Sequence, residues 1–277
     1  MTGSPERRAS IVAGVASAVT VAGMIATPLV PQRSPARRAL SSVVVGGMFV
    51  TTTANAARRW GARRAGVAAT VTAVATGVVE RVGTRTGLPF GRYAYTDALR
   101  PQIAHVPVIV PLAWFGMGLP AREAATAALG PLADRPAARI ALGSFAMTAW
   151  DLFLDPQMVG EGYWAWARRG VYRGIPLSNF VGWFLTGLAI MATLERLLPT
   201  DRPEVGPVAR AVLADRPEDG PGARADVRLV GEYGYMSIMQ TLGFARFFRD
   251  PLVAAAGGLA MLPVAGAAAA QLVRGRS

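Results

Sequence analysis

The sequence predicts an all-α protein, a polytopic integral membrane bundle of about eight helices. Hydrophobic residues make up 52% of its 277 residues, and the mean hydropathy is positive, at +0.33. Apolar runs of about 20 residues recur along the chain, and this is the length that an α-helix needs to cross the hydrocarbon core of a bilayer. The arginines gather between these runs, as is typical of the ends of membrane spans.

Eight apolar runs give this count. The first follows Arg7 and Arg8, but it is too long for a secretory signal, and further runs come after it. Arg246, Arg249 and Pro251 interrupt the pattern near the end of the chain, so seven helices is the alternative. We expect the spans at residues 11–30, 39–57, 65–82, 102–119, 137–154, 175–198, 230–248 and 252–272.

Local signals describe some of these spans further. Small residues at Gly46–Gly47 and Ala65–Gly66 favour the close approach of neighbouring helices. Pro107 and Pro111 predict a kink in the fourth span.

The arginine distribution predicts the orientation. With eight helices, more arginines fall on the side that carries both termini, which places this side in the cytoplasm and the protein in the cell membrane. The loop 83–101 and the segment 155–174 then share the opposite face, where they can meet. The loop 199–229 is rich in Pro, Asp, Arg and Gly, and we expect it to be a flexible polar connector within a single membrane domain, residues 1–277.

The composition excludes several kinds of site. The chain has no cysteine and a single histidine, His105, so thiolate and multi-histidine metal sites are ruled out, and we expect neither a metal nor another cofactor. All 29 basic residues are arginine, which excludes a Schiff-base lysine. The net charge is +12, and the arginines lie between apolar spans and not on one amphipathic face. This distribution fits contact with lipid headgroups and not with nucleic acid.

Two acidic residues at the end of an apolar span are the first candidates for chemistry. Asp151 and Asp155 are one helical turn apart and therefore share a helix face. An ionised Asp at bilayer depth costs roughly 2.5 to 3.5 kcal/mol, and acids there usually mark a functional site. Two carboxylates this close do not ionise together easily, so one is expected to keep a proton and act as a general acid. The alternative is structural: Asp155 would end the helix before Pro156, and Asp151 would be a buried hydrogen-bonding group.

A second candidate region lies between the third and fourth spans and contains Tyr93, Tyr95 and Asp97. In an extended segment the two tyrosines share a face, and in a helix Tyr93 and Asp97 do. Either geometry can present a phenol and a carboxylate together. The alternative is an aromatic belt at the level of the lipid headgroups.

Further candidates come from other spans. Asn179 enters hydrocarbon depth and needs a hydrogen-bond partner there. Trp114 and Trp150 can line a pocket, or they can be packing residues. Glu161 lies in a polar and aromatic segment after the fifth span, and Glu80, near the end of the third, is either another acid or the partner of an arginine.

Three blocks of the sequence resemble the membrane carotenoid-biosynthesis proteins, a family that includes bisanhydrobacterioruberin hydratase and gamma-carotene hydratase. The blocks are GRYAYTDALRPQIAHVPVIVPLAWFGMG, TAWDLFLDPQMVGEGYWAW and YRGIPLSNFVGWFLTG. They come in the same order as in the family and lie within residues 80–198. The resemblance implies the addition of water to the terminal isoprenoid double bond of an acyclic carotenoid end, which gives a tertiary alcohol without a redox cofactor.

Chemistry suggests roles for the candidates in such a reaction. A protonated Asp151 or Asp155 would protonate the alkene at its less substituted carbon and give a tertiary carbocation. Aromatic rings would stabilise the cation, and Asp97 or Glu161 would deprotonate the attacking water. The expected substrate-binding residues are Tyr93, Tyr95, Trp114, Trp150 and Asn179.

Three other functions stay open at this point. A carotenoid cyclase or other carotenoid-modifying enzyme would use the same protonation step and then lose a proton. An Mg-dependent membrane prenyltransferase would use acidic motifs, of which the pair Asp151 and Asp155 is the only one found. A non-catalytic protein would bind or transport the carotenoid unchanged. For the hydratase the expected partners are a linear carotenoid and the bilayer, with other enzymes of the carotenoid pathway as further candidates.

Overall fold

The computed structural model describes residues 5–200 and 225–274. In these residues eight α-helices form one bundle, and the predicted all-α class is confirmed. The helices are α1 Pro5–Ala26, α2 Pro35–Trp60, α3 Ala62–Thr86, α4 Ile109–Leu129, α5 Pro136–Glu161, α6 Leu177–Leu197, α8 Val227–Leu242 and α9 Pro251–Arg274. The short elements are η1 Thr27–Leu29, η2 Gly130–Asp134, η3 Gly243–Phe247, β1 Tyr93–Tyr95, β2 Gln102–Ile103, β3 Val106–Pro107 and β4 Trp164–Trp166.

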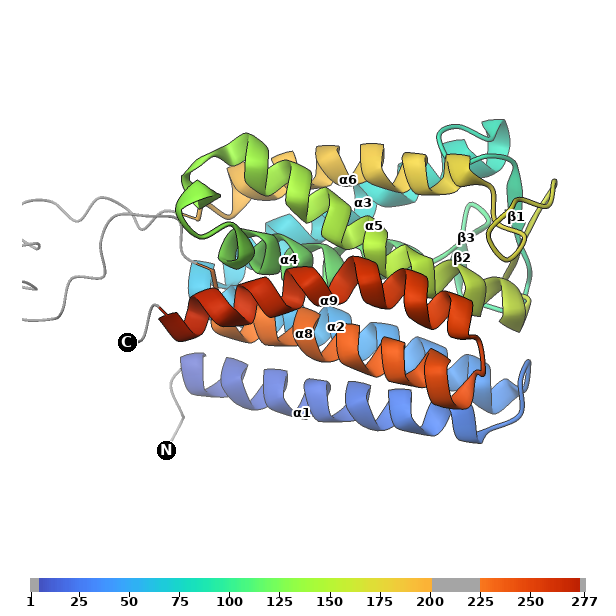
Figure 1. Ribbon diagram of the computed structural model, residues 1–277, viewed down its shortest axis with the longest axis horizontal. Coiled ribbons are helices and arrows are strands. Elements are labelled where there is room, and N and C mark those ends of the chain that lie inside the picture. Colours follow the sequence, from blue (N-terminus) through green and yellow to red (C-terminus); the bar gives the residue numbers. More distant parts are fainter. Residues whose placement is uncertain (1–4, 201–224, 275–277) are drawn as a thin grey trace, which may run out of the picture.

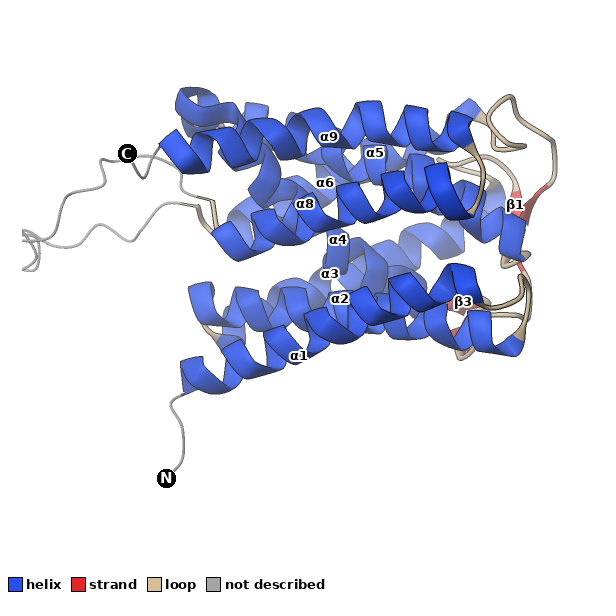
Figure 2. Ribbon diagram, turned by 60° about the horizontal axis from the view of Figure 1, so that its bottom comes forward, coloured by secondary structure: helices blue, strands red, loops and turns tan. Residues whose placement is uncertain are grey.

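The helices run along the bundle, whose two ends differ (Figure 1). Both termini lie at one end, the terminal end, and the strands lie at the other, the strand end (Figures 1 and 2). By length and composition six helices can cross a membrane: α1 together with η1, α2, α3, α5, α6 and α9. Helix α8 has 16 residues, fewer than the roughly 20 of a full span, and continues directly into η3.

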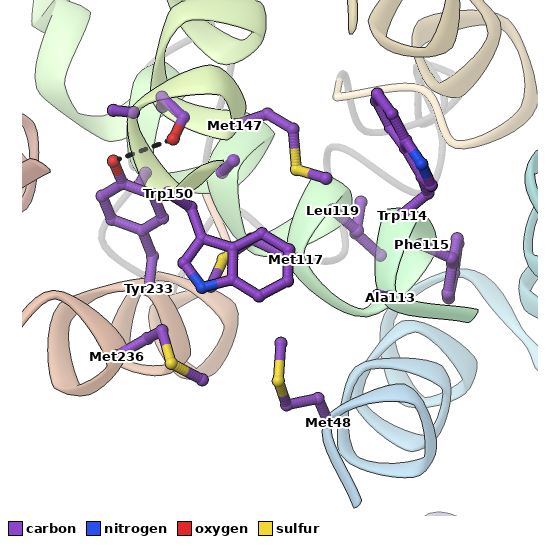
Figure 3. Packing of buried hydrophobic residues seen from close by; sticks show 14 of the residues in the cluster. Met48, Ala113, Trp114, Phe115, Met117, Leu119, Met147, Trp150, Tyr233 and Met236 are labelled. Atoms are coloured by element: carbon purple, nitrogen blue, oxygen red, sulfur yellow. Dashed lines mark hydrogen bonds between the residues drawn. The ribbon is translucent and has the colours of Figure 1, made fainter. Parts of the chain in front are cut away.

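Helix α4 lies at the centre of the bundle. It packs against α2, α3, α5, α8 and α9, and all its residues from 113 to 127 are buried. Gly116 permits the approach of α2, because a Cβ atom there would lie 3.2 Å from the backbone nitrogen of Phe49. The core around α4 includes Met48, Trp114, Phe115, Met117, Leu119, Met147, Trp150, Tyr233 and Met236 (Figure 3).

The fourth span begins later than predicted. Residues 102–107 form a small antiparallel hairpin of β2 and β3, and α4 begins only at Ile109. Pro107 therefore precedes the helix, and Pro111 lies in its first turn, where the missing N–H has no helical acceptor to lose. These two prolines thus lack the interior position that a kink requires, and the proline inside α4 is Pro120.

The fifth span is longer than predicted. Helix α5 continues through Pro156 to Glu161 and is capped by Gly162, which adopts a left-handed conformation with a φ of 74°. Pro156 cannot donate a hydrogen bond to the carbonyl oxygen of Leu152. The hydroxyl of Tyr172 donates to this oxygen instead, at 2.8 Å. Asp155 therefore lies inside a helix, and the interpretation that it ends one is wrong.

The polar connector expected at 199–229 falls mainly on residues 201–224, which lie outside the described residues. Its last residues are helical, since α8 begins at Val227. Asp226 caps this helix: its Oδ1 accepts from the backbone N–H groups of Arg228, at 2.9 Å, and Leu229, at 3.3 Å.

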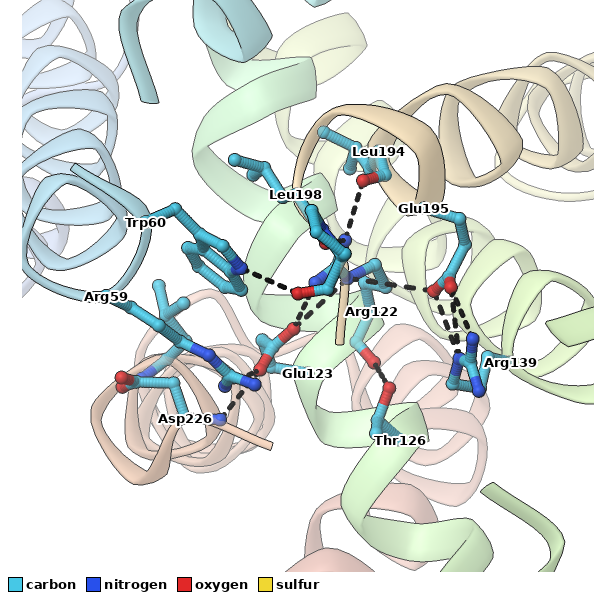
Figure 4. A network of polar contacts seen from close by, with 12 residues as sticks. Arg59, Trp60, Arg122, Glu123, Thr126, Arg139, Leu194, Glu195, Leu198 and Asp226 are labelled. Atoms are coloured by element: carbon cyan, nitrogen blue, oxygen red, sulfur yellow. Dashed lines mark hydrogen bonds and ion pairs between the residues drawn. The ribbon is translucent and has the colours of Figure 1, made fainter. Parts of the chain in front are cut away.

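A buried network of charged side chains joins α2, α4, α5 and α6 at the terminal end (Figure 4). Arg122 is fully buried, and its Nη1 donates to the carbonyl oxygens of Leu194 and Leu198, each at 2.8 Å, at the end of α6. Its Nη2 lies 2.8 Å from Glu123, which also pairs with Arg59 at 2.7 Å. The other labelled members are Trp60, Thr126, Arg139, Glu195 and Asp226.

Candidate active site

Two segments that are distant in the sequence meet at the strand end. Strands β1 and β4 pair antiparallel, with Tyr93 opposite Trp166 and Tyr95 opposite Trp164. The backbone N–H of Thr96 donates to the carbonyl oxygen of Tyr163, the residue directly before β4, at 2.9 Å. The prediction that the segments 83–101 and 155–174 can meet is confirmed. The segment is extended, so both tyrosine side chains lie on the same side of β1.

Both tyrosines donate a hydrogen bond to Glu80, a buried acid near the end of α3. The hydroxyls of Tyr93 and Tyr95 point to Glu80 Oε2, the latter at 2.7 Å. Trp114 Nε1 donates to Oε1 at 3.2 Å. Burial raises the pKa of the Tyr93 and Tyr95 phenols well above their usual range, and the neighbouring Glu80 carboxylate raises them further. The phenols are therefore neutral donors at any physiological pH.

A second pair of acids is joined by one amide. Asn179 Nδ2 donates to Asp151 Oδ2 at 2.7 Å and to Asp155 Oδ2 at 2.6 Å. Trp164 Nε1 donates to Asp155 Oδ1 at 2.5 Å. Asp151 Oδ1 is buried and has no hydrogen-bond partner among the described residues. The predicted common face of the two aspartates and the polar partner of Asn179 are both present.

Glu80, Asp151 and Asp155, together called the acid cluster, have no cationic partner among the described residues. Within residues 5–200 and 225–274, none of the ion pairs includes Glu80, Asp151 or Asp155. Each is at most 4% exposed. Burial of several like charges without a counter-charge is costly, and sharing a proton between neighbouring carboxylates relieves that cost.

A small cavity, the acid cavity, opens onto the cluster. It has a volume of about 50 Å³ and is lined by Glu80, Asp155 and Asn179. A water molecule needs about 10–15 Å³ measured in this way, so the cavity has room for a few waters. Trp114 and Trp183 stack beside it with ring centroids 4.1 Å apart. The aromatic residues in its wall are Phe90, Tyr93, Tyr95, Trp114, Trp164, Trp166 and Trp183.

A larger cavity, the apolar cavity, lies next to the first. It has a volume of about 450 Å³ and extends between α1, α2, α5 and α8. Trp150 lines this cavity and not the acid cavity, and it meets Trp183 edge to face at 6.3 Å. Four apolar residues line both cavities and so separate them: Val45, Ile109, Leu154 and Met158.

Two predicted site residues lie apart from the cluster. The Asp97 side chain is 84% exposed and pairs with Arg100 at 2.8 Å. Glu161 accepts a hydrogen bond from the backbone N–H of Arg33 at 2.8 Å, and its Oε1 lies 3.5 Å from Arg37. The structure brings neither of these carboxylates to the acid cavity. The predicted residues that it does bring together are Tyr93, Tyr95, Trp114, Asp151, Asp155 and Asn179.

Glu80, which the sequence left as either another acid or the partner of an arginine, belongs to the site as an acid with neutral donors. Two other residues of the site, Trp164 and Trp183, were not among the predicted site residues. Trp183 lies one helical turn after Asn179 and therefore on the same face of α6. Trp164 belongs to the polar and aromatic segment after α5, but its contact with Asp155 depends on the pairing of β1 with β4. In the part of the chain that the structure describes, no group of three or more His, Asp or Glu side chains is arranged to hold a metal ion.

Comparison with known proteins identifies the family. A segment of 126 residues is 33% identical to bisanhydrobacterioruberin hydratase of Haloarcula japonica and covers 45% of this chain and 43% of that protein. The chain thus matches less than half of the relative's length. No solved structure matches the chain. Residues 38–213, more than half of the chain, match the family described as carotenoid biosynthesis protein. The chain therefore belongs to the carotenoid biosynthesis protein family.

Proposed function

We propose that this protein is a carotenoid hydratase of the cell membrane, which adds water to the terminal isoprenoid double bond of an acyclic carotenoid end and gives a tertiary alcohol. Membership of the family and the similarity to a bisanhydrobacterioruberin hydratase support the substrate class. The observation that carries the reaction type is the acid cluster. Its three buried carboxyl groups have only neutral donors in the described part of the chain, and they lie beside a cavity that has room for water.

The first step is proton transfer from the pair Asp151 and Asp155. One amide nitrogen contacts both side chains, so they lie close together and share a single proton more easily than they ionise together. Asp155 lines the acid cavity and delivers the proton. The alkene π electrons take it up at the less substituted carbon, and a tertiary carbocation forms at the other carbon.

The surroundings of the acid cavity suit this cation. Ring faces attract a cation by about 2 kcal/mol or more when the site is desolvated. Seven aromatic side chains line the cavity, and two of them, Trp114 and Trp183, are stacked. After the proton transfer, the carboxylates of Asp155 and Glu80, which both line the acid cavity, add electrostatic stabilisation.

The second step is the capture of water. A water oxygen in the acid cavity forms the C–O bond, and Glu80 accepts the proton that this water loses. Tyr93, Tyr95 and Trp114 hold the Glu80 carboxyl in place for this role. The proton then returns to the aspartate pair through cavity water. The net reaction is carotenoid plus water to alcohol, and it requires no cofactor.

The mass of the pigment tests the proposal. A host that makes lycopene is grown with and without the full-length protein, and the extracted pigments are analysed by mass spectrometry. A gain of one or two waters is expected. An unchanged mass with altered absorption would point to cyclisation. An unchanged pigment that stays on the protein would point to binding or transport. A gain of an isoprenoid unit, abolished by a chelator, would point to prenyl transfer.

A further inference from the structure

We infer that the apolar cavity holds the polyene chain next to the reacting end, and that Leu154 and Met158 form a wall through which only a slender, linear end reaches the acid cavity. The inference rests on the proposed function and adds the path of the substrate and the residues that select it.

The lining of the apolar cavity suits a hydrocarbon. None of the described residues that line it is charged. Its volume of about 450 Å³ falls in the range of about 300–1,000 Å³ that is usual for ligand sites. Flexible thioether side chains adapt to an irregular ligand such as a methyl-branched chain and make favourable contacts with π systems. Five of the ten methionines of the chain line the cavity: Met24, Met48, Met158, Met236 and Met239.

The cavity reaches the outer surface of the bundle between α1 and the end of α8. Ile25, Leu29, Leu242 and Phe247 line it, and each of these apolar side chains is more than half exposed. Apolar side chains exposed on the flank of a membrane bundle face lipid. A polyene dissolved in the bilayer can therefore enter sideways without crossing water.

Helix α5 carries the two cavities on adjacent faces. Trp150 and Leu154 are one turn apart and face the apolar cavity. Asp151 follows Trp150, and Asp155 follows Leu154. Both aspartates face Asn179. A chain end that passes Leu154 therefore arrives beside the carboxyl group of Asp155.

The sizes of the two cavities predict selection by shape. The acid cavity, at about 50 Å³, has room for a few water molecules but not for a substituted six-membered ring. A gem-dimethyl alkene end requires only a small displacement of the unbranched Met158 and of Leu154. Cyclic ends are expected to stay in the apolar cavity, where no acid contacts them.

The entrance is tested by filling it. Replacing Ile25→Trp and Leu242→Trp together is expected to lower both lycopene retention and hydration by about tenfold or more, because the chain cannot enter. The matched control is Val74→Trp with Val78→Trp, two exposed apolar residues of α3 that line neither cavity. Lycopene retention is measured on the purified full-length protein by absorption and by quenching of tryptophan fluorescence.

The wall is tested by thickening it. Leu154→Trp is expected to keep lycopene bound and to lower hydration about 100-fold, because displacing reacting groups by about 1 Å already costs this much. Met158→Phe is the second, smaller change, and retained pigment shows in each case that the protein is folded.

The outcomes separate this inference from the proposed function. Normal hydration by both the entrance and the wall variants would overturn the inference and leave the function standing. Lycopene that binds to the wild type and is lost from the entrance variant, without any hydration, would support the cavity and overturn the function.

Discussion

The two ends of the bundle give their buried acids different partners. At the terminal end, Glu123 pairs with Arg59 and Arg122, and Glu195 pairs with Arg139 (Figure 4). At the strand end, the hydrogen bonds that the acid cluster receives from the described residues come only from amide, phenol and indole donors. An arginine keeps its partner ionised and fixed, whereas a neutral donor leaves a carboxyl group free to gain or lose a proton. In the proposed mechanism the first arrangement serves stability and the second serves proton transfer.

Two other acids show which features matter. Glu161 also lies at the strand end, but it pairs with Arg37, and we assign it a structural role. Glu232 accepts hydrogen bonds from the neutral donors Thr52, at 2.8 Å, and Asn55, at 2.5 Å, but it lines neither cavity. The proposed mechanism therefore assigns proton transfer to acids that combine neutral partners with access to a cavity.

The largest effect is expected from Asp155→Asn. The substitution keeps the shape of the side chain but removes the acidic proton, and general acid catalysis contributes about 10²–10⁴-fold. Hydration should fall by this factor while lycopene stays bound, as measured by pigment mass and absorption. The matched control is Asp97→Asn, at the exposed acid, which should hydrate like the wild type. Normal hydration by Asp155→Asn would remove this residue from the mechanism.

The next effect concerns stability at the terminal end. Arg122→Met leaves the Glu123 carboxylate buried with one arginine fewer and frees two carbonyls at the end of α6. Breaking a buried ion pair in this way costs about 3–5 kcal/mol. We expect a large drop in the thermal unfolding midpoint in detergent. An unchanged midpoint would show that the two ends do not differ as described.

A smaller effect is expected from Asn179→Ala. The variant loses the amide that contacts both aspartates, so the pair is no longer held together. Loss of partners for buried groups costs about 1–3 kcal/mol, which corresponds to roughly 10- to 100-fold in hydration rate if the geometry of the pair is what matters. Asn179→Gln, which keeps an amide, should recover part of the rate, and equal rates for both variants would argue against this positioning role.

The smallest effect is expected from Tyr95→Phe. Glu80 keeps its bonds from Tyr93 and Trp114, and a typical hydrogen bond contributes about 0.5–1.5 kcal/mol, so the rate should fall by about 2- to 10-fold. Burial raises the phenol pKa, so Tyr95 stays protonated and neutral as the pH rises through the usual range of tyrosine ionisation. The variant should therefore lower the rate without changing the shape of the pH profile. A lost alkaline limb in the variant would show that the phenol itself titrates.

The sequence predicted what depends on local periodicity. The helical spacing of Asp151 and Asp155 was enough to place them on one face. The expected depth of Asn179 in the membrane was enough to predict that it has a hydrogen-bond partner. Asp97 was wrongly grouped with the tyrosines, because β1 ends before it and it turns to solvent. Glu80 contacts the two tyrosines of β1, and Asp155 contacts Trp164 of β4. These contacts come together because β1 pairs with β4, and no local pattern reveals a pairing between segments so far apart in the chain.

The most direct test of acid-catalysed hydration at the strand end follows the atoms of water into the product. Lycopene is converted by the purified protein in D₂O and, separately, in H₂¹⁸O, and the alcohol is analysed by mass spectrometry. The account predicts one carbon-bound deuterium and one ¹⁸O for each hydrated end, with both incorporations greatly reduced in Asp155→Asn. An alcohol oxygen that does not come from water, or a product without carbon-bound deuterium, would contradict it.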